Sequence, residues 1–212
     1  MADSPTPVFN NPAFPEMLRR RLAQSPFPVE QEAWPGDFFD EPPRRAAVLI
    51  PLVQQDGDWH LLFIRRARND NDRHSGQVAF PGGHMDGGDP GPESAALREA
   101  EEEIGLPRHN VELLGRLGTC RTITNFHVTP VVGRIRQPFS PVPDPREVAH
   151  VFTIPLPWLA DPANVERRDR LVTGRNGAAI DVLYFRQYQG ELLWGVTARL
   201  VAALVAGIST GG

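Results

Sequence analysis

The sequence predicts an α/β (α+β) fold in which a mixed β-sheet is sandwiched between helices. Apolar runs of strand length alternate along the chain with only three or four segments of helical pattern, and this combination is typical of layered sheet-and-helix architectures. A short helix with an acidic face follows a glycine-rich loop near the middle of the chain. The chain has 212 residues and no internal repeat, so we expect one domain with additions to it.

Residues 1–43 are predicted to form a proline-rich extension with one short helix. Nine of the 22 prolines lie in this stretch, where they interrupt any long element. Residues 16–24 suit a helix, with Pro15 in its first turn, because proline is tolerated at the start of a helix. The main domain is therefore expected to cover residues 44–212 and to end with a helix.

The strands follow from apolar runs and turn signals. Residues 46–53 are apolar on both faces and are expected at the centre of the sheet. Asp56-Gly57 is a hairpin signal, so residues 59–66 should return beside the first strand. The other predicted elements are strands at 111–119, 127–136 and 148–155, a short helix at 155–160, hairpin strands at 165–173 and 180–187 around Asn176-Gly177, a last strand at 192–194 and a helix at 196–206.

The central helix has three glutamates on one face. Glu99, Glu102 and Glu103 stand at positions i, i+3 and i+4, which are neighbours on a helix surface. The opposite face carries small and apolar residues, namely Ala96, Leu97, Ala100 and Ile104. Carboxylates at this spacing repel one another, and a hard divalent cation such as Mg²⁺ is a natural ligand for them. The alternative is a solvated acidic face.

The loop before this helix favours the metal-binding alternative. Gly82 and Gly83 allow close approach of the backbone and positive φ angles. The start of the following helix presents N–H groups that suit an anion. A glycine loop and carboxylates that can hold a metal together predict a pyrophosphate-binding site.

The same residues resemble the Nudix box, whose pattern is G-x5-E-x7-R-E-U-x-E-E-x-G-U with U an aliphatic residue. Gly83 and residues 98–106 match it, although Ala100 is small for an aliphatic position. The first half departs from the pattern. Asp89 replaces the glutamate, and eight residues instead of seven separate it from Arg98, so Asp89 is left out of the predicted metal ligands.

The resemblance implies a Nudix-type fold for residues 44–212 and hydrolysis of a diphosphate with the help of Mg²⁺ or Mn²⁺. It assigns the metal to Glu99, Glu102 and Glu103. Arg98 would orient the glutamates, and Glu102 or Glu147 would accept the proton of the attacking water. The competing interpretation of Glu147 is a residue that simply starts the next strand.

A second segment is similar to the signature of the coenzyme A pyrophosphatase branch of the Nudix family. That signature reads approximately L-L-T-x-R-S-A followed by R-x3-G-x3-F-P-G-G. The matching residues are Leu61, Leu62, Arg65, Ala67, Gly76, Phe80, Pro81, Gly82 and Gly83, whereas Phe63 and Arg66 replace the Thr and Ser and Arg73 stands one residue closer to Gly76. Residues 194–200, WGVTARL, resemble the closing helix of the same branch.

This branch implies coenzyme A as the substrate and 4′-phosphopantetheine and 3′,5′-ADP as the products. Arg65, Arg73, Gly82 and Gly83 are the predicted substrate contacts, since a guanidinium binds phosphate bidentately. Both arginines could instead pair with neighbouring acidic side chains. The alternative substrates are ADP-ribose or a dinucleotide. A Nudix fold that binds nucleotides without catalysis is disfavoured, because all three glutamates are present.

Composition limits the other classes of function. The net charge of −4 gives no basic surplus for nucleic-acid binding. No apolar run reaches the length of a membrane span, and the first residues lack the pattern of a signal peptide. The single cysteine, Cys120, excludes an intramolecular disulfide and is expected to be buried. We therefore expect a cytoplasmic protein with a small-molecule nucleotide as its partner; the oligomeric state stays open.

Overall fold

A computed structural model describes residues 9, 11–31, 38–69, 74–171 and 179–209. Within these residues, eight strands form one mixed sheet and two further strands form a separate ribbon. The strands of the large sheet are β1 (Arg44–Gln55), β2 (Asp58–Arg66), β3 (Val78–Ala79), β4 (Gly82–His84), β5 (Val111–Arg116), β6 (Cys120–Arg121), β7 (Phe126–Ile135) and β8 (Val148–Pro155). The ribbon consists of β9 (Val165–Leu171) and β10 (Ala179–Phe185).

Strand β1 lies at the centre of the large sheet, as its apolar sequence predicts. It pairs in parallel with β7 on one side, and on the other side it pairs antiparallel first with β4 and then with β2. The outer neighbour of β7 is β5, and β8 pairs with β2. The predicted hairpin turn between β1 and β2 is confirmed, because Asp56 and Gly57 both have positive φ angles, of 52° and 90°.

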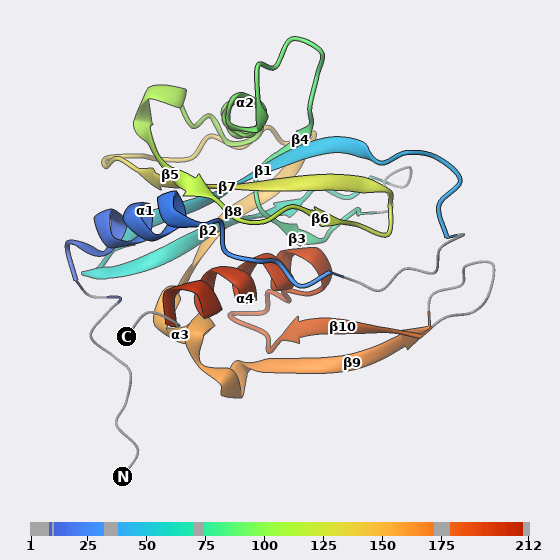
Figure 1. Cartoon of the computed structure of the whole chain (residues 1–212). Coiled ribbons are helices and arrows are strands. Elements are labelled where there is room, and N and C mark those ends of the chain that lie inside the picture. Colours follow the sequence, from blue (N-terminus) through green and yellow to red (C-terminus); the bar gives the residue numbers. More distant parts are fainter. Residues whose placement is uncertain (1–8, 10, 32–37, 70–73, 172–178, 210–212) are drawn as a thin grey trace.

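Helices cover both faces of this sheet, which confirms the predicted architecture. Figure 1 shows α2 (Pro92–Ile104) on one face and α4 (Gly195–Ser209) on the other, with the β9–β10 ribbon beyond α4. Helix α1 (Phe14–Gln24) packs against β5, and α3 (Leu156–Ala160) packs near α4. Two short 3₁₀ turns, Arg108–Asn110 and Pro162–Asn164, complete the helical elements of the described residues.

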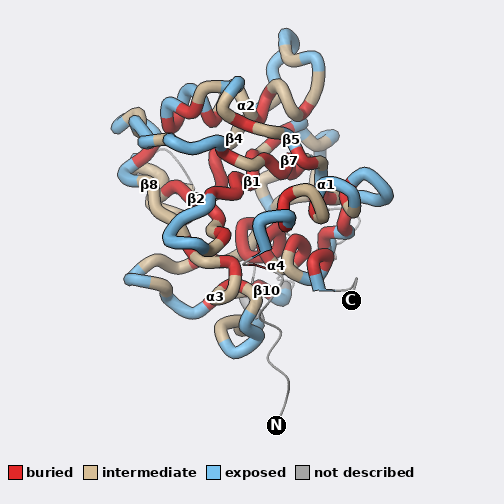
Figure 2. The backbone as a smooth tube through the Cα atoms, turned by 90° about the vertical axis from the view of Figure 1, so that its left-hand side faces the viewer, coloured by how far each residue is buried: buried red, intermediate tan, exposed pale blue. Residues whose placement is uncertain are grey.

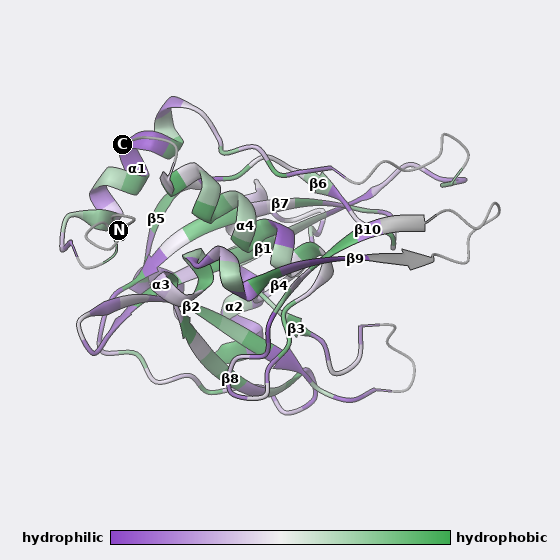
Figure 3. Cartoon of the chain, turned by 90° about the horizontal axis from the view of Figure 1, so that it is seen from below, coloured by the Kyte–Doolittle hydropathy of each residue, from purple (hydrophilic) through white to green (hydrophobic). Residues whose placement is uncertain are grey.

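The core is divided by the sheet into two apolar clusters. One cluster joins Leu49 and Ile64 of the sheet to the apolar face of α2, including Ala100. The other joins Phe63 of β2 to α1 and α4, where Leu204 is fully buried. Figure 2 shows the buried residues concentrated between these layers, and Figure 3 shows the contrast between the hydrophobic α4 and the hydrophilic β9. Neighbouring residues of β2, such as Phe63 and Ile64, therefore face different layers.

Most predicted elements are confirmed, and one is wrong. Helix α2 ends at Gly105, whose φ of 65° is the left-handed conformation that glycine adopts easily. Residues 192–194 form no strand; Trp194 makes one isolated bridge to Tyr184, and Leu193 is buried in the core. The predicted turn at Asn176-Gly177 lies outside the described residues.

The other expectations concern the chain as a whole. Cys120 is buried, as predicted. Among the described helices, none has the length and apolar character needed to cross a membrane. The boundary at residue 44 stays a prediction; Phe14 and Leu18 of the preceding helix are buried in the same apolar cluster as Phe63.

Candidate active site

The glycine loop and the acidic helix meet at strand β4. Gly82 and Gly83 pair with Val48 and Ala47 of β1, so β4 is fixed at the edge of the central strand. The backbone N–H of Gly82 donates a hydrogen bond of 2.9 Å to Oε2 of Glu103. A Cβ atom on Gly82 would lie 2.4 Å from the carbonyl oxygen of Ala47. Glycine is therefore required where the loop passes between β1 and the glutamate.

Gly83 leaves space for the second glutamate of the helix. A Cβ atom at this position would lie 2.6 Å from the carboxyl carbon of Glu99 and 2.7 Å from both of its oxygens. The Glu99 carboxylate thus lies directly against the backbone of the loop. The prediction that Gly82, Gly83, Glu99 and Glu103 form one site depends on these contacts, and the structure brings the four residues together.

Arg98 connects the acidic residues of this site. Its Nη1 atom donates hydrogen bonds to Glu99 at 3.0 Å and to Glu102 at 3.1 Å. Its Nη2 atom donates to Asp89 at 3.1 Å and to the carbonyl oxygen of His84 at 3.0 Å. The hydrogen bonds that Arg98 donates to Asp89, together with the nearby carboxylates, raise the pKa of Arg98. Arg98 therefore lies where a residue that orients the glutamates should lie.

The structure shows the contacts of Asp89, which the sequence did not predict. Its carboxylate accepts hydrogen bonds from Arg98 and from the backbone N–H of Asp86, and only 5% of its side chain is exposed. The hydrogen bond from Arg98 lowers the pKa of Asp89. Asp89 thus holds Arg98 from the loop side and keeps its own negative charge.

Glu103 is the most buried acidic group of the site, with 1% of its surface exposed. Burial raises the pKa of Glu103 from the ordinary 4.5 to about 8. The negative charges of Glu99 and Glu147 contribute to this rise, whereas the Gly82 N–H and Arg66 oppose it. A carboxyl group in this state is ionised at neutral pH only when a cation compensates for the burial.

The other two helix glutamates have different environments. Burial also raises the pKa of Glu99, and the contact with Arg98 partly offsets this rise. Glu102 is the exposed member, with 58% of its side chain accessible. The three glutamates therefore range from a buried carboxyl to a solvated one along a single helix face.

Glu147 reaches this site through a loop that is tied to the end of α2. The backbone N–H groups of Val142 and Asp144 donate to the carbonyl oxygens of Ile104 and Glu103, each at 2.9 Å. These bonds satisfy carbonyls that a helix end leaves without partners. The carbonyl of Glu147 accepts from Ala67 N–H at 2.8 Å. The exposed Glu147 is thereby held close enough for its charge to raise the pKa of both Glu99 and Glu103.

The donor set suits a hard divalent cation, although the side chains are not arranged for one in the structure. Across the described ranges, no group of three or more acidic, histidine or cysteine side chains is placed so that it could hold a metal ion. Arg98 occupies oxygens of Glu99 and Glu102. The chemistry nevertheless fits, because carboxylates that raise one another's pKa are stabilised by a cation that prefers oxygen ligands.

The structure describes one of the two predicted substrate arginines. Arg65 donates to the carbonyl oxygen of Gly76 at 2.6 Å and pairs with Glu191, which also contacts His150. Arg73 lies outside the described residues. Sequence reasoning missed Arg66, which pairs with Glu103. The alternation of strand residues could have indicated it, since Ile64 packs toward α2 and Arg66 stands two positions further on.

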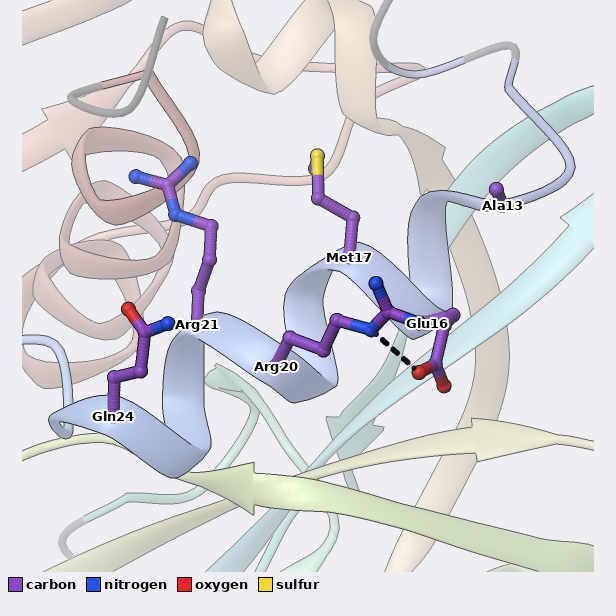
Figure 4. A pocket seen from close by; sticks show the side chains of 6 residues that line it. All are labelled: Ala13, Glu16, Met17, Arg20, Arg21 and Gln24. Atoms are coloured by element: carbon purple, nitrogen blue, oxygen red, sulfur yellow. Dashed lines mark hydrogen bonds and ion pairs between the residues drawn. The ribbon is translucent and has the colours of Figure 1, made fainter.

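One hollow in the described part of the chain lies apart from these groups. Figure 4 shows it along one side of α1, with a volume of about 630 Å³. Its lining includes Met17, Arg21, which donates to the carbonyl oxygen of Ile208, and Arg20, which pairs with Glu16. None of the lining residues belongs to the acidic site, so the hollow adds nothing to it.

The chain is similar to known proteins. A model of the NUDIX domain matches residues 43–173. The NudL proteins of Yersinia pestis (strain Pestoides F) and Yersinia pseudotuberculosis serotype O:1b (strain IP 31758), each described as an uncharacterized Nudix hydrolase, are both 36% identical over 194 residues, which cover 92% of this chain and 94% of the relative.

Solved structures with partial similarity include two Nudix proteins. The Nudix hydrolase RenU from M. Smegmatis is 26% identical, with a TM-score of 0.45, and the match covers 57% of this chain and 76% of RenU. An Ap4A hydrolase binary complex from C. elegans is 18% identical, with a TM-score of 0.46, and the match covers 52% of this chain and 80% of that structure.

Proposed function

The chain belongs to the Nudix family, and on this premise we propose that it hydrolyses the diphosphate bond of coenzyme A to give 4′-phosphopantetheine and 3′,5′-ADP. Its general class is that of a Nudix pyrophosphatase. The observation that carries the proposal is the contact of two glutamates, the buried Glu103 and the half-buried Glu99, with the glycine loop. Such a site combines metal-binding carboxylates with a backbone that a phosphate can approach.

The choice of coenzyme A depends on sequence resemblance. Residues 61–83 and 194–200 are similar to the coenzyme A pyrophosphatase signature. The names of the NudL relatives specify a Nudix hydrolase without a substrate. The net charge of −4 supports a nucleotide-sized partner rather than a nucleic acid, and the single cysteine is compatible with the reducing cytoplasm in which we place the reaction.

Glu99, Glu102 and Glu103 would hold Mg²⁺ or Mn²⁺. When bound, the metal supplies neutralisation of the diphosphate oxygens and a more acidic water. Arg98 orients Glu99 and Glu102 by donating a hydrogen bond to each. The N–H of Gly82 fixes one oxygen of Glu103.

In the proposed reaction, a carboxylate of the chain accepts the proton of the attacking water. A water oxygen forms a bond to one phosphorus, the bond from that phosphorus to the bridging oxygen breaks, and the bridging oxygen leaves with the other phosphate. A carboxylate accepts the proton that the water releases. Glu102 is engaged by Arg98, whereas Glu147 is exposed beside the buried glutamates. We therefore assign the role of general base to Glu147.

A substrate panel tests the proposal. The protein is incubated with Mg²⁺ and coenzyme A, ADP-ribose, NADH or nucleoside triphosphates, and the products are separated by chromatography. We expect coenzyme A to be hydrolysed with the highest kcat/KM. Much faster turnover of ADP-ribose or of a dinucleotide would refute the coenzyme A assignment. Nucleotide binding without hydrolysis of any compound would indicate a non-catalytic module.

The contact with the 3′-phosphate of coenzyme A is tested separately. We propose that Arg73 makes this contact, so R73A should reduce kcat/KM for coenzyme A more than for 3′-dephospho-coenzyme A. Equal losses with the two substrates would remove this role. The same comparison with R65A tests the other predicted contact. A larger loss with coenzyme A would support it, and equal losses would favour the alternative in which Arg65 only pairs with Glu191.

A further inference from the structure

Arg45 and His127 stand beside each other at the end of the sheet where β4 pairs with β1. The two residues are partners in the parallel pairing of β1 with β7. On the other side of β1, the carbonyl oxygen of Arg45 accepts a hydrogen bond of 3.0 Å from the N–H of Met85, the residue that follows β4. Arg45 therefore lies between His127 and the segment that leaves the glycine loop.

The register places both side chains on the α2 side of the sheet. Ala47 and Leu49 of β1 pack in the apolar cluster under α2, and Arg45 has the same alternation along the strand. In β7, Val131 packs in that cluster, and His127 stands four residues before it. Arg45 and His127 thus share the face of the sheet that α2 covers.

The glycine loop and Glu99 lie next to this pair. Ala47 is the register partner of Gly83, and a Cβ atom on Gly83 would lie 2.6 Å from the carboxyl carbon of Glu99. Arg45 precedes Ala47 by two residues, which is about 7 Å along a strand. An extended arginine side chain spans a similar distance, so Arg45 can reach a ligand that lies where Gly83 meets Glu99.

Both side chains are exposed and keep their hydrogen-bond donors available. Within the part of the chain that the structure describes, neither the Arg45 guanidinium nor the His127 imidazole makes a hydrogen bond or an ion pair. The preceding residue, Arg44, differs because its guanidinium lies over the ring of Phe126, 4.3 Å from the ring centroid. Phe126 packs against the apolar cluster on the other face of the sheet. Two successive arginines therefore have different surroundings, and Arg45 is the one on the side of the acidic site.

We propose that Arg45 and His127 bind one phosphate of the substrate's diphosphate. A guanidinium offers two parallel N–H donors that match two phosphate oxygens, and either tautomer of a neutral imidazole supplies one more N–H. The chain has a net charge of −4, and the carboxylates of the site repel a diphosphate, so a positive side chain beside them favours its approach. The inference rests on the proposed function, because it places the diphosphate at Gly83 and Glu99.

Binding the diphosphate has a different signature from supporting the metal ligands. A residue that held Glu99 or Glu103 in place would weaken metal binding when it is removed. In the described structure Arg45 makes no ion pair with either glutamate, and a positive charge near carboxylates opposes the binding of a cation. Removing Arg45 should therefore leave the affinity for Mn²⁺ unchanged or raise it, while the affinity for a diphosphate falls.

The test measures these two affinities in the full chain without coenzyme A. Inorganic pyrophosphate is titrated calorimetrically in the presence of Mg²⁺, and Mn²⁺ binding without pyrophosphate is followed by electron paramagnetic resonance. R45Q should bind pyrophosphate about 10- to 100-fold more weakly, as expected for the loss of charge-assisted hydrogen bonds. H127F keeps an aromatic ring without the N–H and should lose about 3- to 10-fold; a normal affinity of H127F would remove His127 from the site.

Arg44 provides a matched control, because R44Q removes the same charge one residue away, from a side chain that lies over Phe126. R44Q should bind pyrophosphate as the wild type does. The proposal is overturned if R45Q binds pyrophosphate as tightly as the wild type, if R44Q and R45Q lose the same affinity, if R45Q loses Mn²⁺ affinity in parallel, or if the wild type does not bind pyrophosphate.

A second variant covers the case in which R45Q does not fold. R45K keeps the charge without the two parallel donors, so it should bind pyrophosphate more weakly than the wild type, and equal affinities would then overturn the proposal. A protein that binds pyrophosphate through Arg45 but leaves coenzyme A intact would refute only the substrate assignment.

Discussion

Replacing Glu103 by glutamine is expected to change stability and activity in opposite directions. In the absence of metal, burial raises the pKa of Glu103 to about 8. Glutamine has nearly the shape of the protonated carboxyl group and still accepts the hydrogen bond from Gly82 through its amide oxygen. The substitution therefore removes the cost of ionisation while it removes an anionic ligand.

The magnitude follows from the difference between the folded and unfolded states. A pKa of about 8 against the ordinary 4.5, at about 1.4 kcal/mol per pH unit, gives at most about 5 kcal/mol. Because the folded pKa is the higher one, the folded protein binds more protons than the unfolded chain between pH 4.5 and 8. The free energy of unfolding of the metal-free wild type should therefore fall as pH rises through this window. That of E103Q should fall less, because the raised pKa of Glu99 remains but that of Glu103 is removed.

Urea unfolding in the presence of EDTA, at pH values from 5 to 9, measures this effect by tryptophan fluorescence and circular dichroism. E101Q is the control, because Glu101 is an exposed glutamate of the same helix that pairs with Arg108 at 3.2 Å. Its unfolding free energy should stay within about 1 kcal/mol of the wild type at every pH, as for other surface ion pairs.

Metal should reduce the difference in stability between E103Q and the wild type. At a Mn²⁺ concentration about 100 times its Kd, the wild type should gain about 2.7 kcal/mol from binding, and E103Q should gain less. The kcat of E103Q should fall by at least about 10²-fold, as expected when a central electrostatic group is lost. Parallel pH profiles for wild type and E103Q in EDTA would refute the effect of burial. Equal stabilisation of both by Mn²⁺, with near-normal turnover, would refute the assignment of Glu103 as a ligand.

Three other experiments test contacts of the site and of the neighbouring Arg65. R98Q should lower kcat about 10- to 100-fold, the usual cost of losing a group that orients metal ligands, and a normal kcat would contradict this role. G83A should fold but lose activity, since its methyl group would lie 2.6 Å from Glu99. Steady-state kinetics measures the loss of activity, and thermal melting shows whether the variant is folded. A double-mutant cycle of R65M and E191Q should give a coupling of about 1 to 3 kcal/mol in urea unfolding, and additive effects would exclude the pair.

Elements marked by local signals could be predicted from the sequence. The turn at Asp56-Gly57 and the end of α2 at Gly105 depend on positive φ angles that few residues adopt easily. The central place of β1 follows from its apolar faces. The strand expected at residues 192–194 is wrong for a related reason: an apolar run shows burial without showing its partner, and Leu193 is buried by packing rather than by a sheet.

The site was predictable where it lies on one helix and unpredictable where it depends on distant segments. The shared face of Glu99, Glu102 and Glu103 follows from helical spacing. The docking of Val142 and Asp144 on the last turn of α2, which fixes Glu147, joins segments that have no common local pattern. The ion pair between Arg65 and Glu191 likewise joins residues that are far apart in the sequence.

The altered first half of the Nudix box illustrates how geometry can persist when spacing does not. Asp89 has a shorter side chain than the glutamate of the pattern and stands one residue further from Arg98. A backbone hydrogen bond from Asp89 N–H to the Asp86 carbonyl closes a turn there, and the Asp89 carboxylate still reaches Arg98 at 3.1 Å. The requirement is thus a carboxylate that holds Arg98 against the loop, because Arg98 in turn fixes Glu99 over Gly83. A shorter side chain in a tighter turn meets this requirement.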